Sequence, residues 1–293
     1  MIGRRGAPWW FVSPALIAIV VFFVVPVLAA LVLSFTDFDL YGVADHGNVR
    51  FVGFDNYRRL LDAPLFWTAF ANTSLFVVVG APLSIAVSLG AAMLVNARLA
   101  RARGMFRTAL FAPVVTTVVA VAVIWRYILH TRYGLLNYVL GWFGIDAVDW
   151  LGDPHWSMPA LIVFAVWKNF GYNMIIFVAA LQAIPDELYE AARLDGARRL
   201  QQFRFITLPA LGPTMLLVTI LTMVGYFQLF AEPYVMTRGG PAHSTTSVLY
   251  FMFEEGFKWW NLGFASAVAF VLFVIMLAGT LLQLYLARRW SRP

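Results

Sequence analysis

The chain carries few side chains that could perform covalent or metal chemistry. It has no cysteine, and its four histidines lie far apart without an HExxH spacing, which excludes thiol catalysis and a zinc-protease site. Its two lysines, Lys168 and Lys258, do not follow a glycine-rich loop, so the chain has no phosphate-binding Walker motif. No Ser/His or carboxylate pair stands out within the apolar segments. We therefore expect no catalytic residue, no metal site and no cofactor of its own, and we do not expect an enzyme.

Two short stretches, VWKNFGYNM and VGYFQLFAEPY, place polar side chains inside long apolar segments. Their polar members are Lys168, Asn169, Tyr172, Asn173, Tyr226, Gln228 and Glu232. Polar groups at the depth of a bilayer are costly, and they usually face a cavity or another helix. Two interpretations stay open: a path for a polar solute, or hydrogen bonds between helices, with Lys168 paired to Glu232 or to a carboxylate of another chain.

The composition predicts an all-α membrane protein. Hydrophobic residues make up 61% of the chain and charged residues only 12%, whereas soluble domains carry about 25% charged residues. A transmembrane helix needs about 20 apolar residues, and the apolar runs do not alternate as they would in a barrel. Six runs qualify: Trp9 to Phe35, Trp67 to Val95, Thr108 to Leu129, Ser157 to Ala183, Ala210 to Glu232 and Phe264 to Ala287.

The basic residues predict the orientation of these six spans. Thirteen arginines fall on one side, among them Arg4, Arg5, Arg98, Arg101 and Arg292, and six basic residues fall on the other. Loops rich in Lys and Arg stay in the cytoplasm, so both termini are predicted to be cytoplasmic. This placement accounts for the net charge of +6, and no nucleic-acid partner is expected.

One long charged segment, Glu190–Pro209, separates the fourth and fifth apolar runs. Pro185 and the two acidic residues after it are typical of a helix start, and Gly196 stands where a helix ends in a left-handed residue. A second short helix is predicted from Arg198 to Ile206, before Pro209. The residues alone leave two interpretations open: an amphipathic hairpin at the lipid interface, or a docking element for another protein.

A resemblance decides between the two. EAA---G---------I-LP is the signature loop of permease subunits of bacterial ABC importers, and the extended form found in carbohydrate permeases also matches. The matching residues are Glu190, Ala191, Ala192, Asp195, Gly196, Ala197, Phe203, Ile206, Leu208 and Pro209. Stretches such as LSFTDFDL, FVGFDNYRRLL, DWLGDPHW and VMTRGGPA look like the same permeases. The chain resembles the first permease subunit of the maltose and glycerol-3-phosphate type over nearly its whole length.

This resemblance implies a type I ABC importer permease fold in the bacterial cytoplasmic (inner) membrane. It implies half of a path for a sugar or polyol, completed by a second permease subunit. A dimer of ABC ATPase subunits would bind the ATP and grip the signature hairpin, and a periplasmic or lipid-anchored binding protein would deliver the solute. In relatives that bind sugar within the membrane, residues at the positions of Asn169 and Tyr172 take part in sugar binding. By the same resemblance, Tyr226 and Leu229 are also expected to line the sugar path.

The domain organisation follows from the same resemblance. Residues 1–66 are expected to hold the N-terminus, the first span and an outward loop, and residues 289–293 a cytoplasmic tail. Residues 67–288 are expected to form the permease core, with the coupling hairpin at 185–209. A secondary transporter or channel with an interfacial amphipathic hairpin is the alternative, although it would usually show inverted repeats and would not need the Glu190 signature.

Overall fold

The computed structural model describes residues 7–96 and 103–290. Within these ranges the chain is helical, and a single bridge between Thr36 and Phe51 is the only β-type pairing there. Five of the arginines used to predict the orientation (Arg4, Arg5, Arg98, Arg101 and Arg292) lie outside the described residues.

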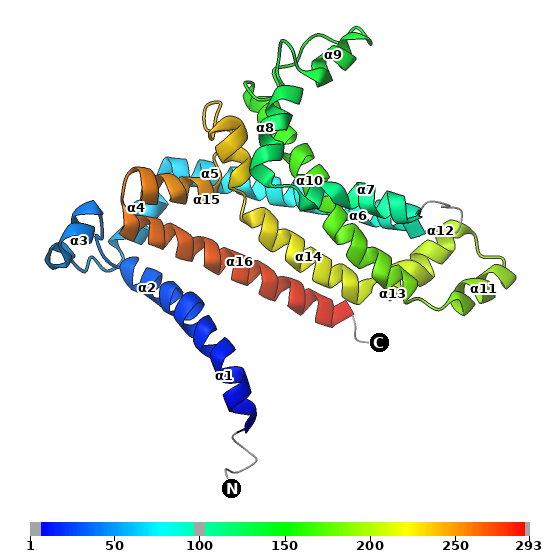
Figure 1. Ribbon diagram of the computed structural model, residues 1–293, viewed down its shortest axis with the longest axis horizontal. Helices are drawn as coiled ribbons and strands as arrows, with labels where there is room; N and C mark the ends of the chain where they lie inside the picture. Colours follow the sequence, from blue (N-terminus) through cyan, green and yellow to red (C-terminus); the bar gives the residue numbers. More distant parts are fainter. Residues whose placement is uncertain (1–6, 97–102, 291–293) are drawn as a thin grey trace. The chain divides into compact units, whose positions relative to one another are not determined.

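The helices are labelled in chain order in Figure 1. The α-helices are α1 (Ala7–Ile19), α2 (Val25–Leu33), α3 (Leu40–Ala44), α4 (Asp55–Asp62), α5 (Pro64–Leu75), α6 (Ala81–Asn96), α7 (Arg103–Val115), α8 (Val118–Ile128), α9 (Leu135–Gly141), α10 (Pro154–Gln182), α11 (Asp186–Leu194), α12 (Arg199–Gln202), α13 (Leu208–Ala210), α14 (Gly212–Phe227), α15 (Val248–Phe253) and α16 (Leu262–Trp290). The turns between them are the 3-10 turn η2 (His46–Asn48) and the π-helical turns η1 (Val20–Val24), η3 (Phe76–Gly80), η4 (Phe203–Thr207), η5 (Pro233–Thr237) and η6 (Glu254–Lys258).

Four helical stretches among the described residues are long and apolar enough to cross a bilayer by themselves. They are Phe11–Leu33, Pro64–Asn96, Pro154–Gln182 and Leu262–Ala287. Two further stretches qualify only as bent pairs of helices: Gly104–Val115 with Val118–Ile128, and Arg199–Ala210 with Gly212–Phe227. The chain is therefore a multi-pass membrane protein with four to six candidate spans.

The third predicted span, Thr108 to Leu129, is not one continuous helix. Its two halves meet at 97°, because Thr117 adopts an extended backbone (φ −71°, ψ 133°). Pro113 lies one turn before the break, and the Thr116 hydroxyl donates to the Pro113 carbonyl at 2.6 Å. The hydroxyl thus satisfies a carbonyl that the broken helix leaves without its usual donor.

The fifth predicted span, Ala210 to Glu232, is also too long. Helix α14 ends at Phe227, and α14 is bent by 69° from the helical stretch that precedes it. Gln228 ends α14 with a backbone outside the helical region (φ −85°, ψ 26°), and residues 229–230 are not helical. Glu232 consequently lies outside α14, immediately before the π-helical turn η5.

Three of the π-helical turns precede a proline by two residues: η1 before Pro26, η3 before Pro82 and η4 before Pro209. A proline interrupts the hydrogen bonding of an α-helix, because it has no N–H to donate to the carbonyl four residues earlier. A π-helical turn shifts the bonding by one residue: Val25 N–H donates to Val20 O and Leu208 N–H to Phe203 O. The chain thus passes these prolines without ending its helices.

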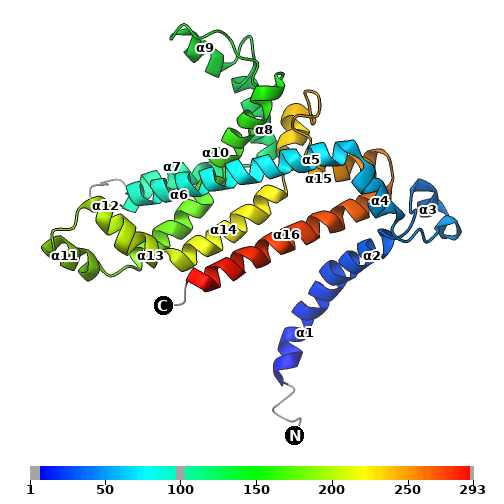
Figure 2. The same cartoon turned by 180° about the vertical axis from the view of Figure 1, so that it is seen from behind.

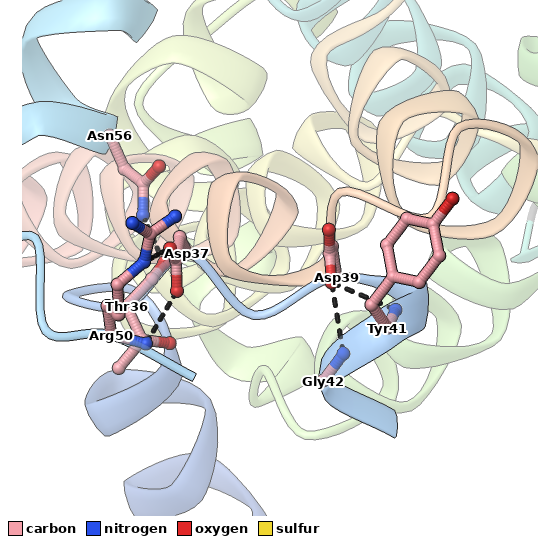
Figure 3. Close-up of polar contacts among 7 residues, drawn as sticks. All are labelled: Thr36, Asp37, Asp39, Tyr41, Gly42, Arg50 and Asn56. Carbon is pink, nitrogen blue, oxygen red and sulfur yellow. Dashed lines mark hydrogen bonds and ion pairs between the residues drawn. The ribbon is translucent and has the colours of Figure 1, made fainter. Parts of the chain in front are cut away.

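The described residues belong to two compact units. One holds residues 1–66 and 251–275, and the other holds residues 67–250 and 276–293. In the first unit Asn56 is buried, and its side-chain amide donates to Ser34 O at 2.9 Å, just after the end of α2. The same amide donates to Thr36 O at 2.8 Å (Figure 3). Gly263 N–H donates to Phe38 O at 2.8 Å. Backbone groups of residues 34–38 are therefore fixed by donors from two other segments.

Asp37 and Arg50 hold the outer end of this unit together (Figure 3). Arg50 donates its backbone N–H to the Asp37 carboxylate at 2.7 Å and its side-chain Nε at 3.0 Å. These two bonds, the backbone bond first, hold the pKa of Asp37 below its ordinary value of 3.8.

Replacement of Asp37 by Asn should therefore lower the stability of the protein only at pH values at which the carboxylate is charged. A carboxylate with a depressed folded-state pKa stabilises the protein above its unfolded pKa, and this contribution disappears as the pH falls through the folded pKa. Because Arg50 is largely exposed, we expect a loss of about 0.5 kcal/mol at pH 7 and a smaller loss at pH 2. Thermal unfolding of detergent-solubilised wild type and Asp37→Asn at both values measures the difference, and an equal gap at pH 2 contradicts the assignment.

Helix α10 is the centre of the second unit. It packs against α6, α7, α8 and α14, and α6, α7, α10 and α14 lie side by side in both views (Figures 1 and 2). Ser88 of α6 donates its hydroxyl to Phe170 O at 2.9 Å. Gly171 meets α7 so closely that an added Cβ would lie 2.5 Å from Leu110 O. Helix α10 is thus held by both α6 and α7. These contacts fix its rotation about its own axis, and therefore the direction in which its polar side chains point.

Candidate functional site

A cavity of about 640 Å³ lies in the second unit. Its walls come from α10, α14, the break between α7 and α8, residues 228–232 and α15. All eight polar or carried-over residues named from the sequence line it: Lys168, Asn169, Tyr172, Asn173, Tyr226, Gln228, Leu229 and Glu232. This volume falls within the range of small-molecule sites. The two sequence stretches, more than 50 residues apart, therefore meet around one space.

The residues of α10 differ in what they can offer a ligand. Asn173 is buried and donates to the Thr222 hydroxyl at 2.8 Å, which joins α10 to α14. Within the described part of the chain Asn169 donates only to the Ala165 carbonyl of its own helix, at 2.9 Å, and Tyr172 is 52% exposed. Asn173 thus has a structural bond, whereas Asn169 and Tyr172 present an amide and an aromatic face to the cavity.

Tyr226 forms a wall of the cavity from α14. It is 5% exposed and its ring lies 5.0 Å from that of Phe76. A Cβ added to Gly80 would lie 2.7 Å from the Tyr226 ring, so the glycine makes room for it. Among the described residues the Tyr226 hydroxyl makes no hydrogen bond of normal geometry, although the buried Ser84 hydroxyl, which also makes none, interacts with it. Such a buried hydroxyl is a group that a ligand or an ordered water can satisfy.

Lys168 is 7% exposed and does not form the ion pair with Glu232 that the sequence left open. Its ammonium donates instead to the Val114 carbonyl at 3.1 Å, at the broken end of α7. Glu232 remains the carboxylate that acts on it electrostatically. Lys168 therefore ties the bend between α7 and α8 to the central helix.

Several cavity residues carried no signal in the sequence. They are Phe76, Val114, Val118, Ala165, Leu221, Thr222, Gly225, Phe230, Ala231 and Leu249. Most are apolar residues in helices that are apolar on every side, where periodicity does not distinguish a cavity face from a lipid face. Thr222 was recognisable in principle, since it stands one helical turn before Tyr226.

The charged segment folds as two short helices joined by a turn. Helix α11 ends in a Schellman motif: Ala197 N–H donates to Ala192 O at 2.8 Å and Gly196 N–H to Arg193 O at 3.1 Å. Gly196 has φ +78°, which confirms the predicted left-handed residue. The second helix follows from Arg199, and Tyr189 and Thr207 join the two helices through their hydroxyls at 2.9 Å.

Six of the signature residues are exposed, and the other four are half-buried. The exposed members are Glu190, Ala191, Asp195, Gly196, Leu208 and Pro209, and the half-buried ones are Ala192, Ala197, Phe203 and Ile206. Large apolar side chains are also exposed here: Leu194 is 90% and Leu200 76% exposed. Among the residues that the structure describes, Glu190 has only Arg193 as a partner, at 3.8 Å on its own helix. The hairpin thus carries an apolar and charged surface that the isolated chain leaves uncovered.

Comparison with known proteins establishes the class. Residues 84–292 match the family of binding-protein-dependent transport system inner membrane components, so the chain belongs to this family. The resemblance stated from the sequence is confirmed, and the hairpin and all the cavity residues except Phe76 lie inside the matched range. The chain is an inner-membrane permease subunit, a component of a transporter and not an enzyme.

Curated relatives cover nearly the whole chain. The arabinooligosaccharides transport system permease protein AraP of Halalkalibacterium halodurans is 33% identical over 291 residues, 99% of this chain and 90% of that protein. The lactose transport system permease protein LacF of Rhizobium radiobacter is 36% identical, over 96% and 93%. The trehalose/maltose transport system permease protein MalF of Thermococcus litoralis is 33% identical, over 94% and 92%.

The fold has a solved counterpart. A chain of a bacterial ABC transporter involved in the import of the acidic polysaccharide alginate superposes with a TM-score of 0.83 at 24% identity, covering 99% of this chain and 97% of that chain. This likeness shows that the chain has the fold of an ABC importer permease.

Proposed function

We propose that the chain is a permease subunit of an ATP-driven, binding-protein-dependent importer of a sugar or polyol, and that its cavity is this subunit's half of the solute path. One observation carries the proposal: the polar residues of two distant stretches line a single cavity in a chain whose relatives are named for sugar transport. Amides and flat aromatic faces suit the hydroxyl and C–H surfaces of a sugar.

The proposed assembly has four kinds of component. A second permease subunit completes the path, two ABC ATPase subunits hydrolyse ATP, and a periplasmic or lipid-anchored protein delivers the solute. The solved alginate transporter is described in complex with an alginate pentasaccharide-bound periplasmic protein, which supports such a partner here. The chain crosses the membrane six times with both termini in the cytoplasm, each bent pair counting as one span.

The hairpin at 185–209 is proposed as the coupling element that the ATPase grips. Its exposed leucines and acidic side chains offer a surface of the kind a protein partner covers. In this arrangement residues 1–66 supply the first span and an outward loop, 67–288 the permease core and 289–293 a tail, of which residues 291–293 lie outside the described chain.

Replacement of Asn169 or Tyr172 by Ala should reduce sugar uptake by about 10-fold while the ATPase stays attached. Both side chains face the cavity, and each loses a hydrogen bond or an aromatic contact worth about 1–1.5 kcal/mol. Uptake of labelled disaccharides into cells measures the effect, and co-purification of the ATPase shows that assembly is intact. Unchanged uptake in both variants contradicts the proposed path.

Purification of the tagged chain from its native membrane in mild detergent tests the proposal as a whole. We expect an ATPase and a second permease to accompany it, and the reconstituted assembly to take up sugars only with ATP and a binding protein. Recovery of the chain alone or as a homo-oligomer would instead favour a secondary transporter or channel, with the hairpin lying at the lipid interface.

A further inference from the structure

Two residues of opposite charge face the proposed sugar path, and they do not touch. Among the described residues that line the cavity, Lys168 and Glu232 are the only ones with a charged side chain. They come from different elements, Lys168 from α10 and Glu232 from the segment before η5. Each acts on the other electrostatically, yet no ion pair within 4.0 Å joins them.

Lys168 is held in place by a backbone group and not by Glu232. In an unbroken helix the Val114 carbonyl would accept from Val118 N–H, but the extended Thr117 prevents this bond. The Lys168 ammonium supplies the missing donor at 3.1 Å and places a positive charge at the negative end of α7. An ammonium has three N–H donors, and one of them is used here.

We propose that Lys168 and Glu232 make this side of the cavity selective for uncharged, polyhydroxylated solutes, an inference that rests on the proposed sugar path. A hydroxyl group both accepts and donates hydrogen bonds, so neighbouring hydroxyls can accept from the Lys168 ammonium and donate to the Glu232 carboxylate. A solute carboxylate meets repulsion at Glu232, and a solute ammonium meets it at Lys168. In a partly dehydrated cavity such repulsion is much stronger than in water.

The test uses single variants that remove one charge and keep a hydrogen-bonding side chain. Glu232→Gln leaves Lys168 uncompensated, and Lys168→Gln leaves Glu232 uncompensated while its amide can still donate to Val114 O. The probes are methyl glucoside, methyl glucuronide and methyl glucosaminide, which are neutral, anionic and cationic versions of one ring. Their binding to the transporter in nanodiscs is measured at millimolar concentration by saturation-transfer NMR. Asp62→Asn, at an exposed carboxylate at the end of α4 and outside the cavity and the hairpin, is the matched control for loss of a charge elsewhere.

We expect wild type and Asp62→Asn to prefer the neutral probe. Relative to the neutral probe, Glu232→Gln should gain about 10-fold for the glucuronide and Lys168→Gln about 10-fold for the glucosaminide, each equal to about 1.4 kcal/mol. Because each variant is read as a ratio between probes, a lower yield of folded protein does not alter the result. The opposite directions separate charge selection from a structural role, which would weaken all three probes equally.

Three outcomes overturn the inference: a wild-type preference for a charged probe, equal losses for all probes in both variants, or no binding by a wild type that transports sugars. The uptake assay with the full assembly separates these from failure of the proposed function. If the assembly takes up sugar but the variants do not shift the probe ratios, only the inference about Lys168 and Glu232 is contradicted. If a complete assembly takes up no sugar, the proposed function is contradicted.

Discussion

Gly196→Arg should abolish uptake although the chain still inserts and folds. Gly196 has φ +78°, and an added Cβ would meet nothing within 4 Å, so a side chain here costs the isolated chain only about 1–2 kcal/mol of backbone strain. If an ATPase covers the turn, the arginine side chain occupies space that the partner needs. We expect the ATPase to be lost on purification and uptake to fall at least about 30-fold.

Gly196→Asn is the matched control, because asparagine tolerates the left-handed conformation. It should keep the ATPase and most of the uptake. Glu190→Lys should behave as Gly196→Arg does, since Glu190 is exposed and its loss costs the helix only about 0.5 kcal/mol. Asp62→Lys, an exposed charge reversal at the end of α4 and outside the hairpin, should transport normally. Normal uptake by both Gly196→Arg and Glu190→Lys would remove the coupling proposal.

Gly171→Val should disrupt the permease core itself. Helices α7 and α10 approach closely at this glycine: an added Cβ would lie 2.5 Å from Leu110 O and 3.2 Å from the Phe111 Cα. Both are backbone atoms, so no rotamer change relieves the contact and the helices must separate. We expect a loss of at least about 2 kcal/mol, with little monodisperse protein in size-exclusion chromatography.

Gly90→Ala provides the control for the packing prediction. Gly90 lies in α6, where an added Cβ meets nothing within 4 Å, so alanine should leave stability unchanged or raise it slightly. Thermal unfolding of the two variants in the same detergent makes the comparison. A Gly171→Val protein as stable as Gly90→Ala would show that the two helices do not meet at this glycine in the membrane.

The hairpin was predictable because its signals are local. Pro185 and the acids after it start α11, and Gly196 ends it in a Schellman motif, as the sequence indicates. The signature residues that name the family stand at fixed spacing in the same segment. Such features depend on neighbours in the chain, and they appear whatever the tertiary structure is.

The bends were not predictable from the same signals. The runs Thr108 to Leu129 and Ala210 to Glu232 were each predicted as one span, because hydropathy measures composition over a window and not direction. The tertiary structure decided otherwise: Thr117 is extended, and α14 ends at Phe227, before Glu232. Both breaks bring backbone or side-chain groups to the wall of the cavity.

The sequence by itself determined the class of protein, the apolar runs and the polar residues that interrupt them, since each can be recognised from composition or from short motifs. Only the tertiary structure decided that these polar residues share one cavity, that Asn173 bonds to Thr222 and that Lys168 holds Val114 instead of Glu232. Helices that are apolar on every side carry no periodicity to show which face meets a neighbour. Their rotation and approach are set by close packing, as at Gly171, and packing depends on residues far apart in the chain.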